Sequence, residues 1–275
     1  PWVADQRHNP RRVRCTTPID ERLDVMTTTE SAPTQPLVAP TIEGPIRPDL
    51  RPKGVNHLAI STADMKAQLT YWAEVLGCPT KALYWMHGVE NTFHGFVELS
   101  GESYIAFVQH PDNSSNIEYG VTHAGNPGAP VTGGATQHIA MHVDTLDDVL
   151  AMRDRIRSHG IQVMGPIDHG MIKSIYFAGP EGLNLEVCCG SDIDENQWID
   201  PDVQALCGIS GDEVERLKHP DPIESGEQPV AQPSTDPSKP QMSYPTGMYE
   251  AIMGASDADI WNGASEATPP VPLTE

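Results

Sequence analysis

The sequence predicts an α+β fold in which a βαβββ unit occurs twice in succession. Three observations support this prediction: an internal repeat of strand and helix patterns, period-two alternation in the short apolar segments, and helix start and stop residues at matching places in both halves. The patterned region spans residues 53–190, with modules at 53–110 and 136–190. Repetition of a unit this long is itself a sign of a duplicated fold.

The first module is predicted to begin with a strand over 55–61. A helix over 64–76 follows, opening at Asp64 and stopping at Gly77, because Asp caps helix N-termini and glycine ends helices. Three further strands complete the module, near 80–86, 92–99 and 103–109.

The second module repeats this order, starting with a strand over 137–143. The next helix spans 145–159, and we expect Asp144 as its N-cap and Gly160 as its stop. Its apolar residues have the spacing of one buried helix face. Three strands follow, near 161–164, 172–178 and 183–189.

The segments outside these modules have a different composition. Residues 1–52 are rich in Pro, Thr, Arg and Asp without a period, so we expect them to be mostly unstructured. Within them, a low-complexity run from Met26 resembles a native start, which leaves the origin of residues 1–25 open. Residues 191–275 form an acidic, proline-rich extension, which we expect to be disordered or extended.

Charge and cysteine content argue against several classes of protein. The chain carries 38 acidic residues against 17 Lys and Arg, a net charge of −21 at pH 7, whereas nucleic-acid and anionic-membrane partners need basic patches. The 5 cysteines, without a recognisable framework, are typical of reduced intracellular thiols. No apolar run is long enough to span a bilayer and no secretory signal is evident, so the sequence favours a cytoplasmic location.

Three residues in three predicted strands are candidates for a metal site. In each strand the more apolar residues share one face, and His57, His138 and Glu186 lie on the opposite face. All three are therefore expected to point into the space that the sheet encloses. Two imidazoles and one carboxylate form the facial triad that holds non-haem Fe(II) and leaves the opposite positions open. A metal held in this way can bind substrate and dioxygen together.

Two βαβββ modules with candidate ligands on their first and last strands resemble the vicinal oxygen chelate superfamily, which includes glyoxalases, epimerases, antibiotic-resistance proteins and extradiol dioxygenases. The resemblance covers about residues 53–190 and implies that the modules pair into a cupped mixed sheet around one metal. In the lyase and isomerase branches each module supplies two ligands, one at the start of its first strand and a Glu on its last. Here Ala106 stands where the first module would supply its Glu, which moves the balance toward the dioxygenases.

A more specific segment resembles the ring-cleavage signature of single-domain type I extradiol dioxygenases. It runs from Ile167 through His169, Tyr176 and a Gly-Pro-Glu-Gly turn to Glu186. The resemblance implies that His169 and Tyr176 are active-site residues beside the Glu186 ligand. It also implies His123 as the catalytic acid or base, since the family places such a His shortly before its second His ligand.

The resemblance therefore implies an enzyme that opens the ring of a small aromatic diol with Fe(II), or with Mn(II) in its place, and with O2 as co-substrate. Two alternatives stay open. One is a glyoxalase-like lyase or epimerase with another divalent metal, for which Glu98 is the only nearby candidate for a second carboxylate. The other is a ligand-binding protein without chemistry. Neither nucleic acid nor membrane is expected as a partner, and a homo-oligomer stays open.

Overall fold

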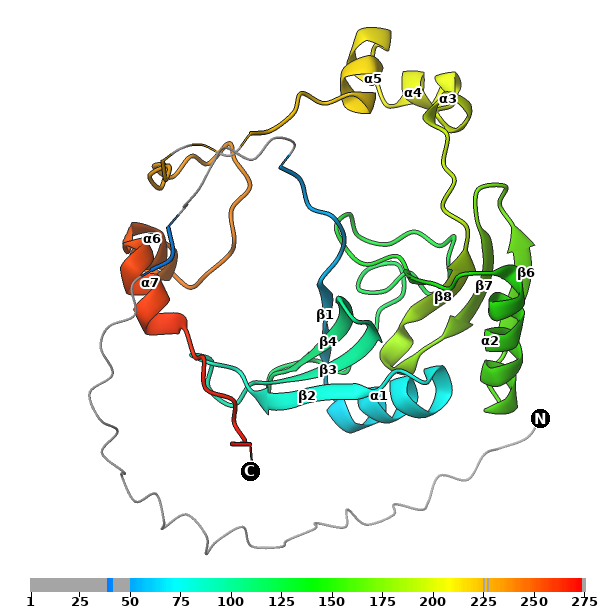
Figure 1. The fold of residues 1–275 in the computed structure, drawn as a ribbon, viewed down its shortest axis with the longest axis horizontal. Helices are drawn as coiled ribbons and strands as arrows, with labels where there is room; N and C mark the ends of the chain where they lie inside the picture. Colours follow the sequence, from blue (N-terminus) through cyan, green and yellow to red (C-terminus); the bar gives the residue numbers. More distant parts are fainter. Residues whose placement is uncertain (1–38, 42–49, 225, 227, 274–275) are drawn as a thin grey trace, which may run out of the picture.

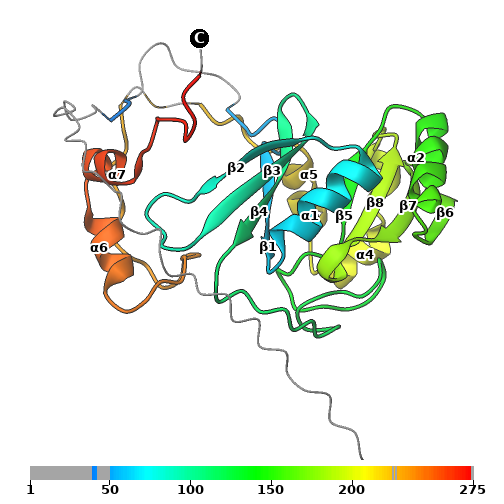
Figure 2. The ribbon, with the colours of Figure 1, turned by 90° about the horizontal axis from the view of Figure 1, so that it is seen from below.

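The computed structural model describes residues 39–41, 50–224, 226 and 228–273. Within them the chain forms two four-stranded mixed sheets, each accompanied by a helix, and a series of short helices that follows (Figure 1, Figure 2). The predicted α+β class and the repeated βαβββ order are confirmed. Most of the N-terminal segment lies outside the described residues, so its expected lack of structure stays a prediction.

The first module has the strand order β1-β4-β3-β2, with β1 parallel to β4 and the other neighbours antiparallel. Both predicted helix signals act as expected. The Asp64 carboxylate accepts a hydrogen bond from the backbone N–H of Ala67 at 2.9 Å, and Gly77 ends the helical segment at a φ of 81°. The elements are β1 (His57–Thr62), α1 (Met65–Tyr71), the π-helical turn η1 (Trp72–Leu76), β2 (Thr80–Trp85), β3 (Phe93–Ser100) and β4 (Ser103–Gln109).

The second module repeats the topology of the first, with the strand order β5-β8-β7-β6 and β5 parallel to β8. Its second strand differs from expectation, because it runs over Val163–Asp168 rather than 161–164. The elements are β5 (Ile139–His142), α2 (Leu146–Ser158), β6 (Val163–Asp168), β7 (Lys173–Ala178), the short turn η2 (Pro180–Gly182) and β8 (Asn184–Cys189).

The start of α2 corrects a second expectation, since the predicted N-cap Asp144 is wrong. The cap is Thr145, whose hydroxyl accepts a hydrogen bond from the backbone N–H of Asp148 at 3.1 Å. The Asp148 carboxylate in turn accepts from the backbone N–H of Thr145 at 3.0 Å. This reciprocal capping box satisfies two helix-end donors at once, which a cap one residue earlier does not.

Apolar side chains from both modules form one core on the helix-covered side of the sheets. The Trp72 ring is fully buried and meets the Phe107 ring edge-on, with a centroid distance of 6.0 Å. Helix α1 approaches β3 so closely that a Cβ added to Gly95 would come within 2.5 Å of the Met65 sulfur. The other large, fully buried members of the core are Ile105, Ile156, Ile175, Leu185, Val97, Val149 and Val187.

The two modules are joined through the backbone of their helices and turns. Arg155 on α2 donates to the carbonyl oxygens of Val75 and Glu74 in the first module, at 2.6 and 2.8 Å. On the other side, the Tyr71 hydroxyl donates to the carbonyl oxygen of Ala178 at 2.8 Å. These contacts place α1 and η1 against α2 and the β7–β8 turn, so each module covers part of the other.

The C-terminal extension is not wholly extended, contrary to expectation. Ser210 and Ser256 cap two of its helices by accepting from backbone N–H groups, which explains local helix formation in a proline-rich segment. No residue of these helices is buried within the described part of the extension. Its helices are α3 (Glu195–Trp198), α4 (Pro201–Leu206), α5 (Gly211–Lys218), α6 (Met248–Gly254) and α7 (Asp257–Ala264).

The extension also returns toward the start of the described core, because the backbone N–H of Leu50 donates to the carbonyl oxygen of Ile223 at 2.7 Å. In Figure 1 the segment that carries α6 and α7 lies on the side of the first sheet away from the second module. Among the described residues, no helix is long and apolar enough to cross a membrane.

Candidate metal centre and adjoining cavity

The sheet register of the second module brings Glu186 next to two of the predicted site residues. Glu186 on β8 pairs with Ala140 on β5 and with Tyr176 on β7, so Tyr176 and Glu186 share one face of the sheet. His138 directly precedes β5 and reaches the same place, with its Nε2 atom 3.0 Å from Glu186 Oε2. Residues that are 48 positions apart in the chain therefore meet because β5 and β8 are parallel neighbours.

The tautomer of the His138 ring is set by the neighbouring residue, Gln137. The Nδ1 atom lies 3.0 Å from the amide oxygen of Gln137, and because that oxygen only accepts, Nδ1 carries the proton. The Nε2 atom is then free to face the Glu186 carboxylate, and two acceptors at 3.0 Å need a proton or a cation between them. A hydrogen-bond acceptor on one ring nitrogen fixes the orientation of a His whose other ring nitrogen binds a metal.

The Glu186 carboxylate has the burial that a metal ligand needs. The residue is 1% exposed, and its Oε1 atom is buried without a hydrogen-bond partner in the described part of the chain. A buried carboxylate oxygen without a partner is costly unless something positive binds it. The donor set of one imidazole nitrogen and one carboxylate suits a divalent transition metal, so these residues fit the expected ion.

Tyr176 and His169 extend this cluster. The Tyr176 hydroxyl lies 3.0 Å from His169 Nε2, and the Tyr176 ring stands edge-on to the His138 ring at a centroid distance of 6.0 Å. Burial raises the pKa of Tyr176 above its usual range, and the neighbouring Glu186 carboxylate adds to that rise. The hydroxyl therefore keeps its proton at neutral pH and acts as a hydrogen-bond donor.

The C-terminal extension reaches the turn that carries His169. A Cβ added to Gly170 would come within 2.8 Å of the Trp198 ring, so α3 packs directly against this turn. At the same turn, the Asp168 carboxylate accepts from the backbone N–H of Gly170 at 2.8 Å. This contact ties the position of His169 to the extension.

His57 is not brought into this group. Among the described residues, no set of three or more His, Cys, Asp or Glu side chains is arranged to hold a metal ion. The His57 ring packs against Phe96 at a centroid distance of 5.5 Å, and its Nδ1 atom lies 2.9 Å from the Asn56 side-chain oxygen. Of the three predicted ligands, the structure joins His138 and Glu186, while His57 lies at the start of a strand in the other sheet.

The face of the first sheet that carries His57 is aromatic. In the register, Ala106 pairs with Ala59 and Phe96, so the place of the family's second carboxylate holds a methyl group beside an aromatic ring. Tyr84 stacks on Phe96 at a centroid distance of 6.2 Å. Glu98 lies in the same row as His57, two strands away, and binds Lys81 at 2.9 Å.

His94 is a residue of this face that the sequence analysis did not single out. Its ring lies 5.7 Å from Tyr84 and 5.8 Å from Phe96, and both ring nitrogens are buried without a partner in the described part of the chain. Burial lowers the pKa of His94, and the nearby His57 lowers it further. The sequence could have indicated this place, because His94 comes two residues before Phe96 and the period of two puts both on the same face of a strand.

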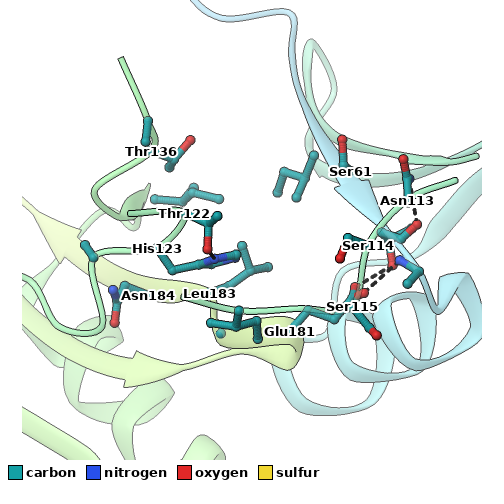
Figure 3. Close-up of a pocket in the computed structure, with 18 of the residues that line it drawn as sticks. Ser61, Asn113, Ser114, Ser115, Thr122, His123, Thr136, Glu181, Leu183 and Asn184 are labelled. Atoms are coloured by element: carbon teal, nitrogen blue, oxygen red, sulfur yellow. Dashed lines mark hydrogen bonds between the residues drawn. The ribbon is translucent and has the colours of Figure 1, made fainter. Parts of the chain in front are cut away.

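A cavity of about 580 Å³ lies between the facing edges of the two sheets, under the linker that joins the modules (Figure 3). His138 and His123 both line it, whereas Glu186, His57, His169 and Tyr176 do not. His123 lies over the β7–β8 turn, because a Cβ added to Gly182 would come within 3.4 Å of its ring. Its Nδ1 atom is 2.9 Å from the Thr122 hydroxyl oxygen.

The linker that covers the cavity is fastened at both ends. The Asn113 side chain donates to the carbonyl oxygens of Thr62 and Val108, both at 2.9 Å. At the other end, the Gln137 side chain donates to the carbonyl oxygen of Ala129 at 2.9 Å. The cavity wall is therefore continuous with both modules.

Glu181 is a second residue that sequence reasoning missed. Its carboxylate accepts from the Ala63 backbone N–H and from the Gln68 side chain, both at 2.7 Å, and also from the Thr62 hydroxyl. Burial alone would raise the pKa of Glu181, but these hydrogen bonds hold it below its usual range. Glu181 adopts a φ of 53°, a backbone conformation that is uncommon for a residue other than glycine. In the sequence, the only sign of this conformation was the Gly-Pro-Glu-Gly segment, which predicts a turn.

Comparisons with known proteins agree with this arrangement. Residues 54–187 match the family model of the Glyoxalase/Bleomycin resistance protein/Dioxygenase superfamily. A biphenyl-2,3-diol 1,2-dioxygenase from Rhodococcus globerulus is 37% identical over 62 residues, which span 22% of this chain and only 30% of that relative. A probable lactoylglutathione lyase from Synechocystis sp. is 26% identical over 134 residues, 48% of this chain and 91% of that protein.

Among solved structures, a glyoxylase/bleomycin resistance protein/dioxygenase domain from Frankia sp. EAN1pec is similar at 15% identity and a TM-score of 0.42, covering 51% of this chain and 99% of that one. The family match coincides with the two βαβββ modules and includes both His138, directly before β5, and Glu186 on β8. Residues 54–187 of this chain therefore form a domain of the Glyoxalase/Bleomycin resistance protein/Dioxygenase superfamily.

Proposed function

We propose that the protein is a metal-dependent dioxygenase that opens the ring of a catechol-type substrate next to its two hydroxyl groups. The observation that carries the proposal is the His169–Tyr176 pair, joined at 3.0 Å, beside the His138–Glu186 pair. A pair of side chains that can move a proton then lies beside an imidazole and a buried carboxylate that suit a metal, and ring opening uses both kinds of group. The aromatic face around Phe96 supports an aromatic substrate.

His138 and Glu186 would hold the metal. The structure does not bring His57 to this pair, so His57 as a third ligand is carried by the resemblance and not by the geometry. The unpartnered Oε1 atom of Glu186 and the Nε2 atom of His138 are the groups that such an ion would satisfy. When bound, Fe(II), or Mn(II) in its place, supplies a Lewis acid for the two diol oxygens and an open position for O2.

The surrounding residues bind the substrate and move its protons. The Tyr176 hydroxyl donates a hydrogen bond to a substrate oxygen, and His169 holds that hydroxyl in position through the 3.0 Å contact. His123 lies on the cavity wall together with His138, and there it accepts and returns the proton that ring opening requires.

A glyoxalase-like lyase is the second candidate, because the lyase relative aligns over 91% of its own length. That reading needs a fourth ligand from the first module. Ala106 offers no donor atom, and the Glu98 carboxylate is paired with Lys81. This donor set favours the dioxygenase.

The test is anaerobic reconstitution with Fe(II), followed by O2 uptake and product absorbance against a panel of substituted catechols. We expect one O2 consumed per catechol, a new yellow product band, and loss of both in His138→Ala. His159→Ala, a change at the exposed end of α2, serves as the matched control. Fully metallated protein that consumes no O2 with small and bulky catechols would overturn the proposal and favour the lyase.

A further inference from the structure

The cavity beside His138 has a chemical character that differs from that of the aromatic face. Its wall combines hydroxyl and amide side chains with small and branched apolar ones, and no Phe, Tyr or Trp of the described chain lines it (Figure 3). Among the described residues that line it there is no Lys or Arg, whereas two carboxylates, Asp112 and Glu181, are present. A ligand group in this space therefore meets neutral donors and acceptors and a net negative potential.

Two of the hydroxyls are available to a ligand. Ser61 on β1 and Thr136 before β5 face the cavity from opposite sides, and neither side-chain hydroxyl makes a hydrogen bond within the described part of the chain (Figure 3). Ser61 follows Ala59 on the strand face that carries His57. One hydroxyl thus comes from each side of the cavity, and Thr136 lies two residues before the proposed ligand His138.

The position of His138 connects the cavity to the metal centre. His138 lines the cavity, and its Nε2 atom lies 3.0 Å from Glu186, so the cavity adjoins the proposed metal centre. A volume of about 580 Å³ exceeds what a catechol ring alone needs and falls within the usual range of small-molecule sites.

We propose that this cavity receives an uncharged, hydroxyl- or amide-bearing side arm on the catechol, and that it discriminates against carboxylate arms. The inference rests on the proposed ring-opening function for the identity of the ring. It assigns the selectivity to Ser61 and Thr136 as hydrogen-bonding groups and to Asp112 and Glu181 as the source of repulsion. Glutathione conjugates, which are anionic, are disfavoured by the same charges.

The first test measures binding without turnover, by titration calorimetry at neutral pH. The probes are three meta-substituted phenols with 3-hydroxypropyl, propyl and 2-carboxyethyl arms, none of which carries the vicinal diol. We expect the hydroxypropyl phenol to bind about five-fold more tightly than the propyl phenol, the effect of one neutral hydrogen bond, and at least tenfold more tightly than the carboxylate. Equal or tighter binding of the carboxylate would overturn the inference.

A charge-introducing variant tests whether the selectivity arises in this cavity. Ser61→Lys places a cation on the wall and should raise the affinity for the carboxylate arm, relative to the hydroxypropyl arm, about tenfold. Ser100→Lys makes the same change of charge on β3 outside the cavity and should leave that ratio unchanged. Identical ratios in the two variants would show that the arm binds elsewhere.

The same arms on catechols separate this inference from the proposed function. O2 uptake with kcat/KM in the order of the phenol affinities supports both. O2 uptake with the carboxylate catechol as the preferred substrate overturns the side-arm assignment and leaves the dioxygenase reading intact. If the phenols bind in the expected order of affinity but none of the catechols causes O2 uptake, the dioxygenase reading is overturned. The preference of the cavity for an uncharged polar arm then stands.

Discussion

His138 and Glu186 meet at 3.0 Å between Nε2 and Oε2, at the end of the second module where β5 and β8 run parallel. The imidazole is about one-third exposed, whereas the carboxylate is 2% exposed. The pair thus combines an open side, from which a ligand enters, with a closed side that keeps water from the carboxylate. The proposed metal site needs both sides, the open one for substrate and the closed one for the ion.

Glu186→Gln should remove most of the divalent metal affinity. The amide keeps the size of the side chain but removes the negative charge that a cation needs in a buried position. We expect Fe(II) or Mn(II) affinity to fall by at least about 100-fold, measured by equilibrium dialysis with metal analysis. Glu102→Gln, an exposed change on the β3–β4 turn, should bind metal like the parent protein; equal metal content in both variants would contradict the assignment.

Tyr176→Phe should lower kcat while leaving the metal content unchanged. The change removes only the hydroxyl that contacts His169, so proton transfer suffers but the ligands stay. Loss of one acid–base group typically lowers the rate about 100-fold or more. The readout is kcat on the best catechol beside the iron-to-protein ratio, with Tyr249→Phe on α6 as the matched control. Loss of iron in Tyr176→Phe would instead indicate a structural role.

The Tyr176–His169 pair should act as one unit. His169→Ala alone should lower kcat by a factor similar to that for Tyr176→Phe, and the double variant should be little worse than either, because both changes break the same contact. A double-mutant cycle on kcat measures this coupling. Fully additive losses would show that the two side chains act independently.

The sequence predicted the repeated modules because alternation and helix caps are local signals. Asp64 and Gly77 bound the first helical segment as expected, since each acts through its own backbone neighbourhood. Strand alternation and donor chemistry singled out His138 and Glu186 as candidate ligands, but their contact depends on which strands become neighbours, and that pairing was implied only by the resemblance to a family. His57 lies outside that group for the same reason: its place follows from how the two sheets pack.

The Glu181 contacts were beyond the reach of sequence patterns. They join a turn of the second module to α1 and β1 of the first, more than 100 residues away in the chain. No periodicity predicts a contact between modules, and a Gly-Pro-Glu-Gly segment signals only a turn. The N-cap of α2 shows that local signals can also be ambiguous, because Asp144 and Thr145 are both good N-cap residues. The hydrogen bond that the Asp148 carboxylate accepts from the Thr145 backbone N–H decides between them.

Gly95→Ala should destabilise the first module. The added Cβ would lie 2.5 Å from the Met65 sulfur and 3.3 Å from a Leu69 methyl carbon, so the buried Met65 side chain must be displaced within a filled core. Overpacking of this kind costs about 1–3 kcal/mol. The free energy of unfolding from urea titration measures the effect, and Gly101→Ala is the control, because a Cβ there meets nothing within 4 Å. Equal stability of the two variants would contradict the close packing of α1.

The Glu181 junction should make the protein less stable in acid. Hydrogen bonds from Thr62, Gln68 and the Ala63 backbone hold the pKa of Glu181 below its ordinary value in the folded state, although burial opposes them. A lowered folded-state pKa contributes stability above the unfolded value, near 4.5, and that contribution disappears as the pH falls through the folded value. We therefore expect part of the stability of the module junction to be lost below about pH 4.5.

Glu181→Gln isolates this contribution, because the amide cannot carry the charge that the three donors stabilise. We expect a loss of about 1–3 kcal/mol at pH 7 and a smaller difference from the parent protein near pH 3. Urea unfolding at both pH values, with Glu102→Gln as the control for a change in net charge, gives the comparison. A Glu181→Gln deficit that is the same at both pH values would show that the carboxylate contributes through shape and not through charge, and that the junction is insensitive to acid.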